Sequence, residues 1–200
     1  MKRARRSTCL GRLPIGCERL LDETVASCEE AVEAYIRRHR KKAADEFGYF
    51  RRCPSLATAI RFAALCMLPD GQRHPHQYRI PREVLGQAEH GLQACHAELI
   101  RCRRFEDVLR LVERELLEIR GIGVLTAYDI ATRLAAHLGI EPGRVYLHAG
   151  TAAGARALGL NYRSKYLELR DLPVAFARLR PREIEDCLCL YKSQLASHAA

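Results

Sequence analysis

Apolar residues recur at spacings of three and four along most of the chain, a pattern that predicts helices. The first such segment covers residues 18–46, and its apolar positions are Leu20, Leu21, Val25, Cys28, Val32 and Ile36. Apolar and polar residues do not alternate over any stretch long enough to indicate a strand. We therefore predict an all-α protein whose first helix covers residues 18–46.

Proline and glycine residues divide the rest of the pattern into further helices. A second helix is expected over 54–68, because Pro54 is tolerated near a helix start, and the loop 69–81 follows it. A third helix runs from 81 or 82 towards 103, a fourth covers 105–119, and a fifth covers 124–138 and is stopped by Gly139. A short helix over 148–158 and the segments 172–179 and 181–195 complete the chain.

The predicted helices group into two lobes behind a basic tail. The tail covers residues 1–17, a helical lobe covers 18–104, and a second lobe covers 105–200. A chain of 200 residues is long enough to bury one core, so the two lobes can equally pack as one compact domain.

The net charge of +9 favours a polyanionic partner such as a nucleic acid. The positive charge is concentrated in four segments: residues 2–12, 37–42, 51–52 and 101–104. Such clusters are also typical of solvated helix faces. The sequence lacks both an apolar run of about 18 residues and an export signal, so we expect no membrane span and a cytoplasmic location with reduced cysteines.

The segment "EIRGIGVLTAYDIA", from Glu118 to Ala131, places Gly121 and Gly123 between two apolar helical runs. Each glycine costs about 1 kcal/mol relative to alanine inside a helix, so this pair indicates a turn. Gly121 and Gly123 permit a tight turn of the backbone. Ile122 fills the space between the two helices, and the small Ala127 lets these helices approach closely. The backbone N–H groups that start the second helix then form a site for a DNA phosphate.

This hairpin and the segment "VYLHAGTAAGARALGL", residues 145–160, resemble the endonuclease III-type family of DNA glycosylases. The likeness covers residues 116–160. It implies a two-lobed helical bundle of the helix-hairpin-helix type that binds double-stranded DNA as a monomer, without a cofactor or metal. A nucleotide flipped out of the duplex would lie between the lobes.

Two positions depart from the family pattern. Tyr146 stands where the family has its catalytic aspartate, and Leu125 stands where its lyase members have a lysine. A lyase needs an amine to form a Schiff base, and Leu125 has none. The resemblance therefore implies a monofunctional N-glycosylase, which hydrolyses the bond to a damaged or modified base and leaves an abasic site.

Asp129 is the candidate for the missing carboxylate. It lies four residues after Leu125, so the two side chains share one face of the second hairpin helix. An aspartate there can stabilise positive charge on the sugar, with Tyr146 and His148 lining the pocket. Asp129 can equally form a surface ion pair with Arg133, four residues further on.

The loop "RHPHQYR" is the second candidate for chemistry. Its polar side chains can stack on or hydrogen-bond to a flipped base, and they are His74, His76, Gln77, Tyr78 and Arg79. The same loop can be merely solvated, and its two histidines lack a convincing third ligand for zinc. His148 can contact substrate or simply begin its helix, and Glu185 and Asp186 are expected on the exposed side of the last helix.

The sequence leaves alternative functions open. One is a non-catalytic module that keeps the DNA-anchoring hairpin, which Tyr146 and Leu125 favour. Another is an RNA-binding or protein-interaction domain, because a phosphate anchor does not distinguish bases.

Overall fold

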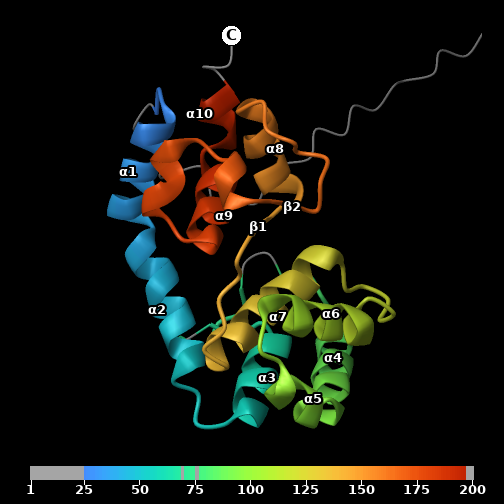
Figure 1. Cartoon of the computed structure of the whole chain (residues 1–200). Helices are drawn as coiled ribbons and strands as arrows, with labels where there is room; N and C mark the ends of the chain where they lie inside the picture. Colours follow the sequence, from blue (N-terminus) through green and yellow to red (C-terminus); the bar gives the residue numbers. More distant parts are fainter. Residues whose placement is uncertain (1–24, 69, 75–76, 197–200) are drawn as a thin grey trace, which may run out of the picture.

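The computed structural model describes residues 25–68, 70–74 and 77–196, and this part of the chain is mostly helical (Figure 1). The fold class is therefore all-α, as predicted. The α-helices are α1 (Cys28–Arg38), α2 (Arg40–Arg51), α3 (Leu56–Ala64), α4 (Arg82–Ala94), α5 (His96–Arg101), α6 (Phe105–Leu116), α7 (Val124–His137), α8 (Ala149–Ala157), α9 (Pro181–Leu190) and α10 (Lys192–Ala196). The short 3-10 helices η2 (Leu169–Asp171) and η3 (Val174–Arg178) precede α9.

Three of the predicted helices are each interrupted once. The first is split at His39, the third at Cys95 and the last at Tyr191. None of these residues is glycine or proline, so no helix-breaking residue in the sequence predicts the interruptions. The C-terminal end of α7, in contrast, follows prediction, because Gly139 has the left-handed φ of +72° that a helix-ending glycine adopts.

Two hydrophobic clusters divide the described residues into lobes. The hairpin lobe contains α2–α7, residues 40–140, and buries Phe50, Leu99 and Ala127 completely. The terminal lobe contains α1 and residues 145–196, and Tyr35 and Cys187 are fully buried within it. Helix α1 packs against η3 and α9 of the terminal lobe.

A small antiparallel sheet lies where the chain passes from one lobe to the other. β1 (Val145–Tyr146) pairs with β2 (Tyr166–Leu167), and Tyr146 lies opposite Tyr166. Successive side chains of a strand point to opposite sides, so Val145 enters the core of the terminal lobe while Tyr146 enters that of the hairpin lobe. β1 is thus shared by both cores, and it lies between the lobes in Figure 1.

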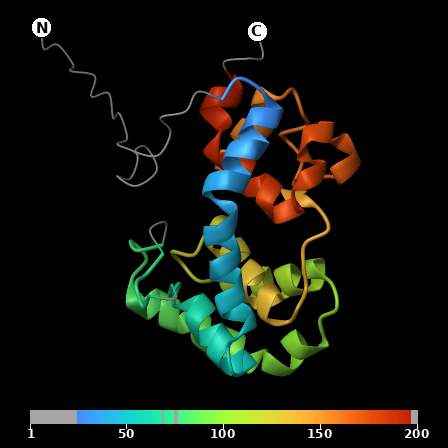
Figure 2. The same cartoon turned by 90° about the vertical axis from the view of Figure 1, so that its left-hand side faces the viewer.

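Helices α1 and α2 form a second connection. Figure 2 shows them following one another along one side of the molecule, α1 on the terminal lobe and α2 on the hairpin lobe. The two lobes are therefore joined at two places, through His39 and through β1. In the described part of the chain, no helix combines the length and apolar character that a membrane span requires.

Candidate functional site

Helices α6 and α7 meet at the predicted glycine turn. Gly121 has a φ of +105°, a left-handed conformation that favours glycine. Ile122 is only 7% exposed and packs in the core of the hairpin lobe, and Ala127 is fully buried where α7 approaches α6. The local geometry therefore agrees with the packing roles that the sequence suggested for Ile122 and Ala127.

The N-terminus of α7 is open to solvent. Gly123 is its N-cap residue, and no side chain caps the helix there. Val124 and Leu125, in the first turn, are 59% and 42% exposed. The first backbone N–H groups of a helix have no partner within the helix, and its dipole makes this end attractive to anions. The start of α7 can therefore accept a phosphate.

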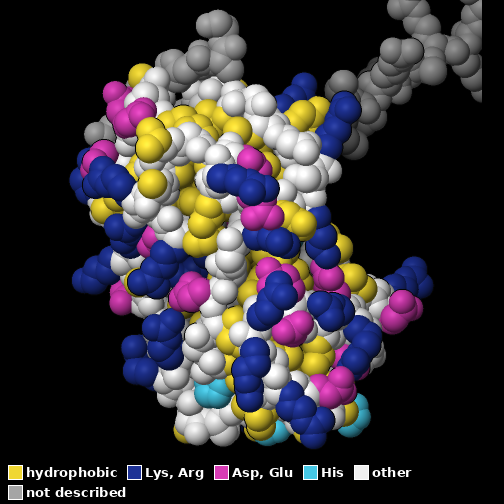
Figure 3. All heavy atoms as spheres, viewed as in Figure 1, with side chains coloured by type: hydrophobic (Ala, Val, Ile, Leu, Met, Phe, Trp, Pro, Cys, Tyr) yellow, Lys and Arg dark blue, Asp and Glu magenta, His cyan; other side chains and the backbone are white. Residues whose placement is uncertain are grey.

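Charge around the hairpin is mixed. Figure 3 shows Lys and Arg side chains spread over both lobes on one face, with Asp and Glu between them. Segment 37–42 lies where α1 ends and α2 begins, segment 51–52 lies at the end of α2, and segment 101–104 lies between α5 and α6. The tail 1–17 lies outside the described residues. Electrostatic attraction for DNA would therefore come from several separate groups.

Polar residues of the two lobes meet beside the middle of α7, and we call this group the interlobe cluster: Gln77, Tyr128, Asp129, His148, Glu185 and Asp186. The Tyr128 hydroxyl donates a hydrogen bond to Oε2 of Glu185. The ring centroids of Tyr128 and His148 are 4.3 Å apart, and His148 Nε2 lies 3.9 Å from Oε1 of Glu185. The cluster thus joins α7 to the start of α8 and to α9.

Burial changes the acidity of these groups. The side chain of Glu185 is only 12% exposed. Burial raises its pKa well above that of an exposed glutamate, and the negative charges of Asp186 and Asp129 raise it further, against the lowering effect of the Tyr128 hydrogen bond. Burial also lowers the pKa of His148 and so favours its neutral form. Glu185 can therefore hold a proton beside a neutral histidine.

Asp129 faces the loop that precedes α4. The side-chain amide of Gln77 donates a hydrogen bond to Oδ2 of Asp129, and Gln77 is only 1% exposed. Arg133, the alternative partner of Asp129, forms an ion pair with Glu46 at 3.3 Å. Asp129 therefore lies in a contact between loop and helix, and the buried Gln77 orients its carboxylate.

The remaining residues of the predicted base-reading loop are arranged differently. Tyr78 is 53% exposed, and Arg79 Nε donates to its hydroxyl at 2.9 Å. The backbone N–H of His74 donates to the carbonyl of Cys66 at 2.8 Å. His76 lies outside the described residues. Of this loop, then, Gln77 reaches Asp129, while Tyr78 and Arg79 lie on its surface.

Tyr146 is a core residue. It is 3% exposed and packs against Phe105 and Tyr128, whose ring centroids lie 5.2 and 5.4 Å from its own. Burial raises its pKa to about 12, so its hydroxyl stays protonated at neutral pH. Tyr146 therefore packs against the Tyr128 ring in the core, and its neutral side chain presents no charge to a substrate.

The expectation that Glu185 and Asp186 lie on an exposed face was wrong. Glu185 contacts α7 through Tyr128, and Oδ2 of Asp186 accepts a hydrogen bond of 2.9 Å from the Tyr35 hydroxyl of α1. Helix α9 packs against α1, α8 and β1, so some of its polar residues are not exposed to solvent. The two successive acids before the apolar run from Cys187 to Leu190 were the signal in the sequence, but their partners are distant along the chain.

Within the described residues, no group of three or more His, Cys, Asp or Glu side chains is arranged to hold a metal ion. No protein-family model, curated protein or solved structure matches this chain. The interpretation of the site therefore depends on its geometry and chemistry.

Proposed function

We propose that this protein is a helix-hairpin-helix protein that binds double-stranded DNA and excises a damaged or modified base as a monofunctional N-glycosylase. One observation carries the proposal: α7 combines both parts of such a site. Its first turn offers uncapped backbone N–H groups, and a little over one turn further on it places Tyr128 and Asp129 in the interlobe cluster. A backbone phosphate bound at Gly123 would hold the DNA beside these groups.

The chemistry follows from the two carboxyl groups: burial raises the pKa of Glu185, and Asp129 accepts a hydrogen bond from Gln77. Cleavage of the bond between sugar C1′ and the base nitrogen leaves the electron pair on the base, and protonated Glu185 can supply the proton that the departing base takes up. Positive charge then develops on the sugar, where the Asp129 carboxylate can stabilise it and accept a proton from the attacking water. The products are the free base and an intact abasic site.

An excision assay tests this function. The protein is incubated with duplexes that each carry one modified base, and strands are analysed before and after alkali, which cleaves abasic sites. We expect breaks only after alkali, because exposed Leu125 provides no amine for lyase chemistry. Covalent trapping of protein on DNA by borohydride would contradict the monofunctional mechanism.

Matched substitutions separate the carboxyl roles. Asp129→Asn and Glu185→Gln keep size and hydrogen-bonding capacity, and each should reduce excision by about a hundredfold or more without weakening DNA binding. Tyr146→Phe removes only a buried hydroxyl and serves as the control. Full activity of Asp129→Asn would show that Asp129 only anchors the loop through Gln77.

The second candidate function is a non-catalytic DNA-binding module. The burial of Tyr146, at the position where the similar family has its aspartate, favours this alternative. The expected result is then duplex binding that weakens steeply with salt, together with no excision from any duplex in the panel. Absence of duplex binding at low salt would contradict both functions.

A further inference from the structure

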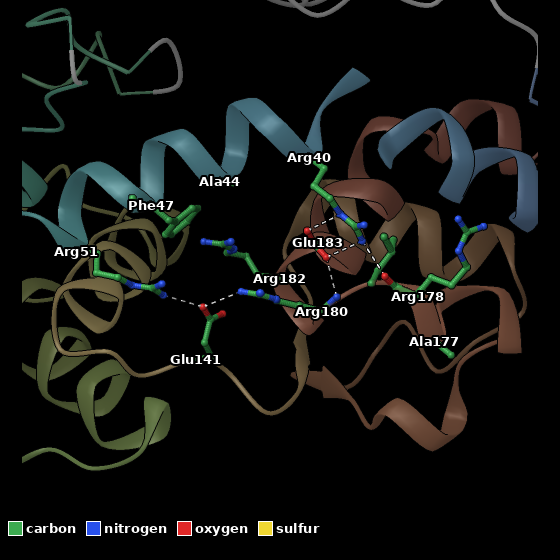
Figure 4. Close-up of a pocket in the computed structure, with 12 residues that line it drawn as sticks. Arg40, Ala44, Phe47, Arg51, Glu141, Ala177, Arg178, Arg180, Arg182 and Glu183 are labelled. Carbon is green, nitrogen blue, oxygen red and sulfur yellow. Dashed lines mark hydrogen bonds and ion pairs between the residues drawn. The ribbon is translucent and has the colours of Figure 1, made fainter. Parts of the chain in front are cut away.

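A cavity of about 540 Å³ lies between the lobes, lined by α2, the segment after α7, η3 and the start of α9 (Figure 4). Five arginines line it: Arg40, Arg51, Arg178, Arg180 and Arg182. The acidic residues at its wall are Glu141 and Glu183, so five positive and two negative charges leave an excess of three positive charges. Such a concentration of guanidinium groups requires an explanation.

The two carboxylates hold most of the arginines in place. Glu141 lies between Arg51 and Arg180, with nitrogen–oxygen distances of 3.3 and 3.5 Å. Glu183 accepts two hydrogen bonds from Arg40, of 2.9 and 3.1 Å. Figure 4 shows the first group on one side of the cavity and the second on the other. These three arginines are therefore already oriented before any ligand binds.

Arg182 lies between these two groups and differs from them. The residue is only 9% exposed, and its guanidinium carbon lies 3.3 Å from the centroid of the Phe47 ring. Its Nε is buried and has no hydrogen-bond partner among the described residues. A buried N–H group without an acceptor is costly. Arg182 also lines the cavity, so an anion bound there would lie beside its positive charge.

The chemistry of the wall selects the ligand class. Guanidinium groups match phosphate in planar geometry and charge, and a phosphate monoester carries close to two negative charges at neutral pH. The cavity is larger than a phosphate group needs and falls within the range of small-molecule sites. Ala44, Phe47 and Leu179 add an apolar part to the wall.

We propose that this cavity binds a terminal phosphate monoester attached to a group of about mononucleotide size. The ligand can be a free mononucleotide or the phosphorylated end of a DNA strand, because both present the same chemistry. The site is separate from the hairpin: α2 borders the molecule on the left in Figure 1, whereas the yellow turn between α6 and α7 lies on the right. The proposal therefore does not depend on glycosylase activity.

Isothermal titration calorimetry on the full chain at low ionic strength tests the site. The probes are inorganic phosphate, adenosine monophosphate and adenosine. We expect the two phosphates to bind and adenosine, which lacks the charged group, to give no heat. No heat from either phosphate at millimolar concentration would overturn the proposal, as would equal binding of adenosine and its monophosphate.

Substitutions locate the binding. Arg182→Gln should weaken the binding of adenosine monophosphate by about tenfold or more, because the substitution removes a charge-assisted hydrogen-bond donor. Arg180→Gln should weaken the same binding several-fold. The Arg180 side chain is 65% exposed, so this variant should fold even if Arg182→Gln does not. Arg170→Gln is the control, since Arg170 is 86% exposed and does not line the cavity. Unchanged affinity in Arg180→Gln and in any folded Arg182→Gln would overturn the assignment.

Two oligonucleotides distinguish the sources of the phosphate. A single strand with a 5′-phosphate is compared with the same strand carrying a 5′-hydroxyl. Tighter binding of the phosphorylated strand than of the hydroxyl strand identifies a DNA end as a ligand of the cavity. Equal binding of the two strands, together with binding of the free mononucleotide, identifies the free nucleotide. If Arg180→Gln weakens both strands equally, the cavity binds internal phosphates and the monoester proposal fails.

Discussion

Asp186 illustrates how one buried carboxyl group links structure to pH. It accepts the Tyr35 hydrogen bond, but burial has the larger effect and raises its pKa from 3.8 to about 6. The folded protein therefore keeps this proton at pH values where the unfolded chain has lost it. Stability from this group is present in full below pH 3.8 and is lost as the pH rises through about 6.

Asp186→Asn should flatten this pH dependence. Asparagine resembles the protonated acid and still accepts the Tyr35 hydrogen bond. Between pH 4 and pH 7 the wild-type chain should lose at most about 3 kcal/mol more free energy of unfolding than the variant. Urea denaturation at several pH values measures the difference.

Asp171→Asn is the matched control, because the Asp171 side chain on η2 is 56% exposed. It should follow the wild-type pH profile. Parallel profiles for wild type and Asp186→Asn would mean that Asp186 is as acidic in the folded protein as in the unfolded one.

At the scale of the element, α7 is the central helix of the hairpin lobe. It packs against α2, α3 and α6, and all of its residues from Thr126 to Ala136 except Asp129 are buried. The first turn is exposed, and Asp129 and the terminal His137 are partly exposed. A helix held this firmly can position a phosphate at one end and a carboxyl group further along with little motion between them.

Gly123→Asp should separate folding from DNA binding. The Gly123 backbone is extended and a Cβ there meets open space, so aspartate can cap α7. Its carboxylate would occupy the free N–H groups and repel phosphate. We expect thermal stability to be unchanged or slightly higher, and duplex affinity at low salt to fall by about tenfold or more.

Gly123→Asn provides the comparison, since asparagine caps the helix without a charge. The loss of duplex affinity should be smaller in Gly123→Asn than in Gly123→Asp, and each variant should weaken binding to two unrelated duplexes equally. Fluorescence anisotropy measures the affinity of each variant for each duplex. Wild-type affinity in Gly123→Asp, or a loss confined to one sequence, would exclude the start of α7 as the phosphate anchor.

At the scale of the whole molecule, polar side chains join the lobes as much as apolar ones do. Arg40 of α2 contacts Glu183 of α9, and Tyr128 of α7 contacts Glu185 of the same helix. On the opposite side, Lys165 near β2 lies 3.1 Å from Glu113 of α6. The interface therefore includes hydrogen-bonded polar pairs. Removing one member of such a pair leaves the other without its partner and destabilises the fold.

Arg40→Met should destabilise the fold. The Glu183 side chain is 10% exposed, so loss of Arg40, itself 34% exposed, leaves a nearly buried carboxylate without its strongest partner. We expect the free energy of unfolding to fall by about 2 kcal/mol, less than for a fully buried pair because Arg40 is partly solvated.

The double variant Arg40→Met/Glu183→Gln should recover part of that loss, since glutamine needs no positive charge. Arg170→Met, on an exposed side chain, is the control. Urea denaturation of the wild type, Arg40→Met, Glu183→Gln and the double variant measures the coupling between Arg40 and Glu183. If the two single substitutions have additive effects, this contact does not stabilise the interface.

The sequence by itself determined the local features of this protein. Apolar spacing identified the helical class, because helix formation depends on neighbours three and four residues apart. Gly121 and Gly139 marked the two ends of the segment that contains α7, because their left-handed backbone favours glycine whatever surrounds it. The burial of Ile122 and Ala127 followed from their positions in the turn.

Only the tertiary structure decided which residues of distant segments meet. Arg40 and Glu183 are 143 positions apart, and Gln77 and Asp129 are 52 apart. The same holds for the burial of Glu185 and Asp186 and for the five arginines around one cavity. These features depend on how α2, α7 and α9 pack in space, and no periodicity along the chain records that packing.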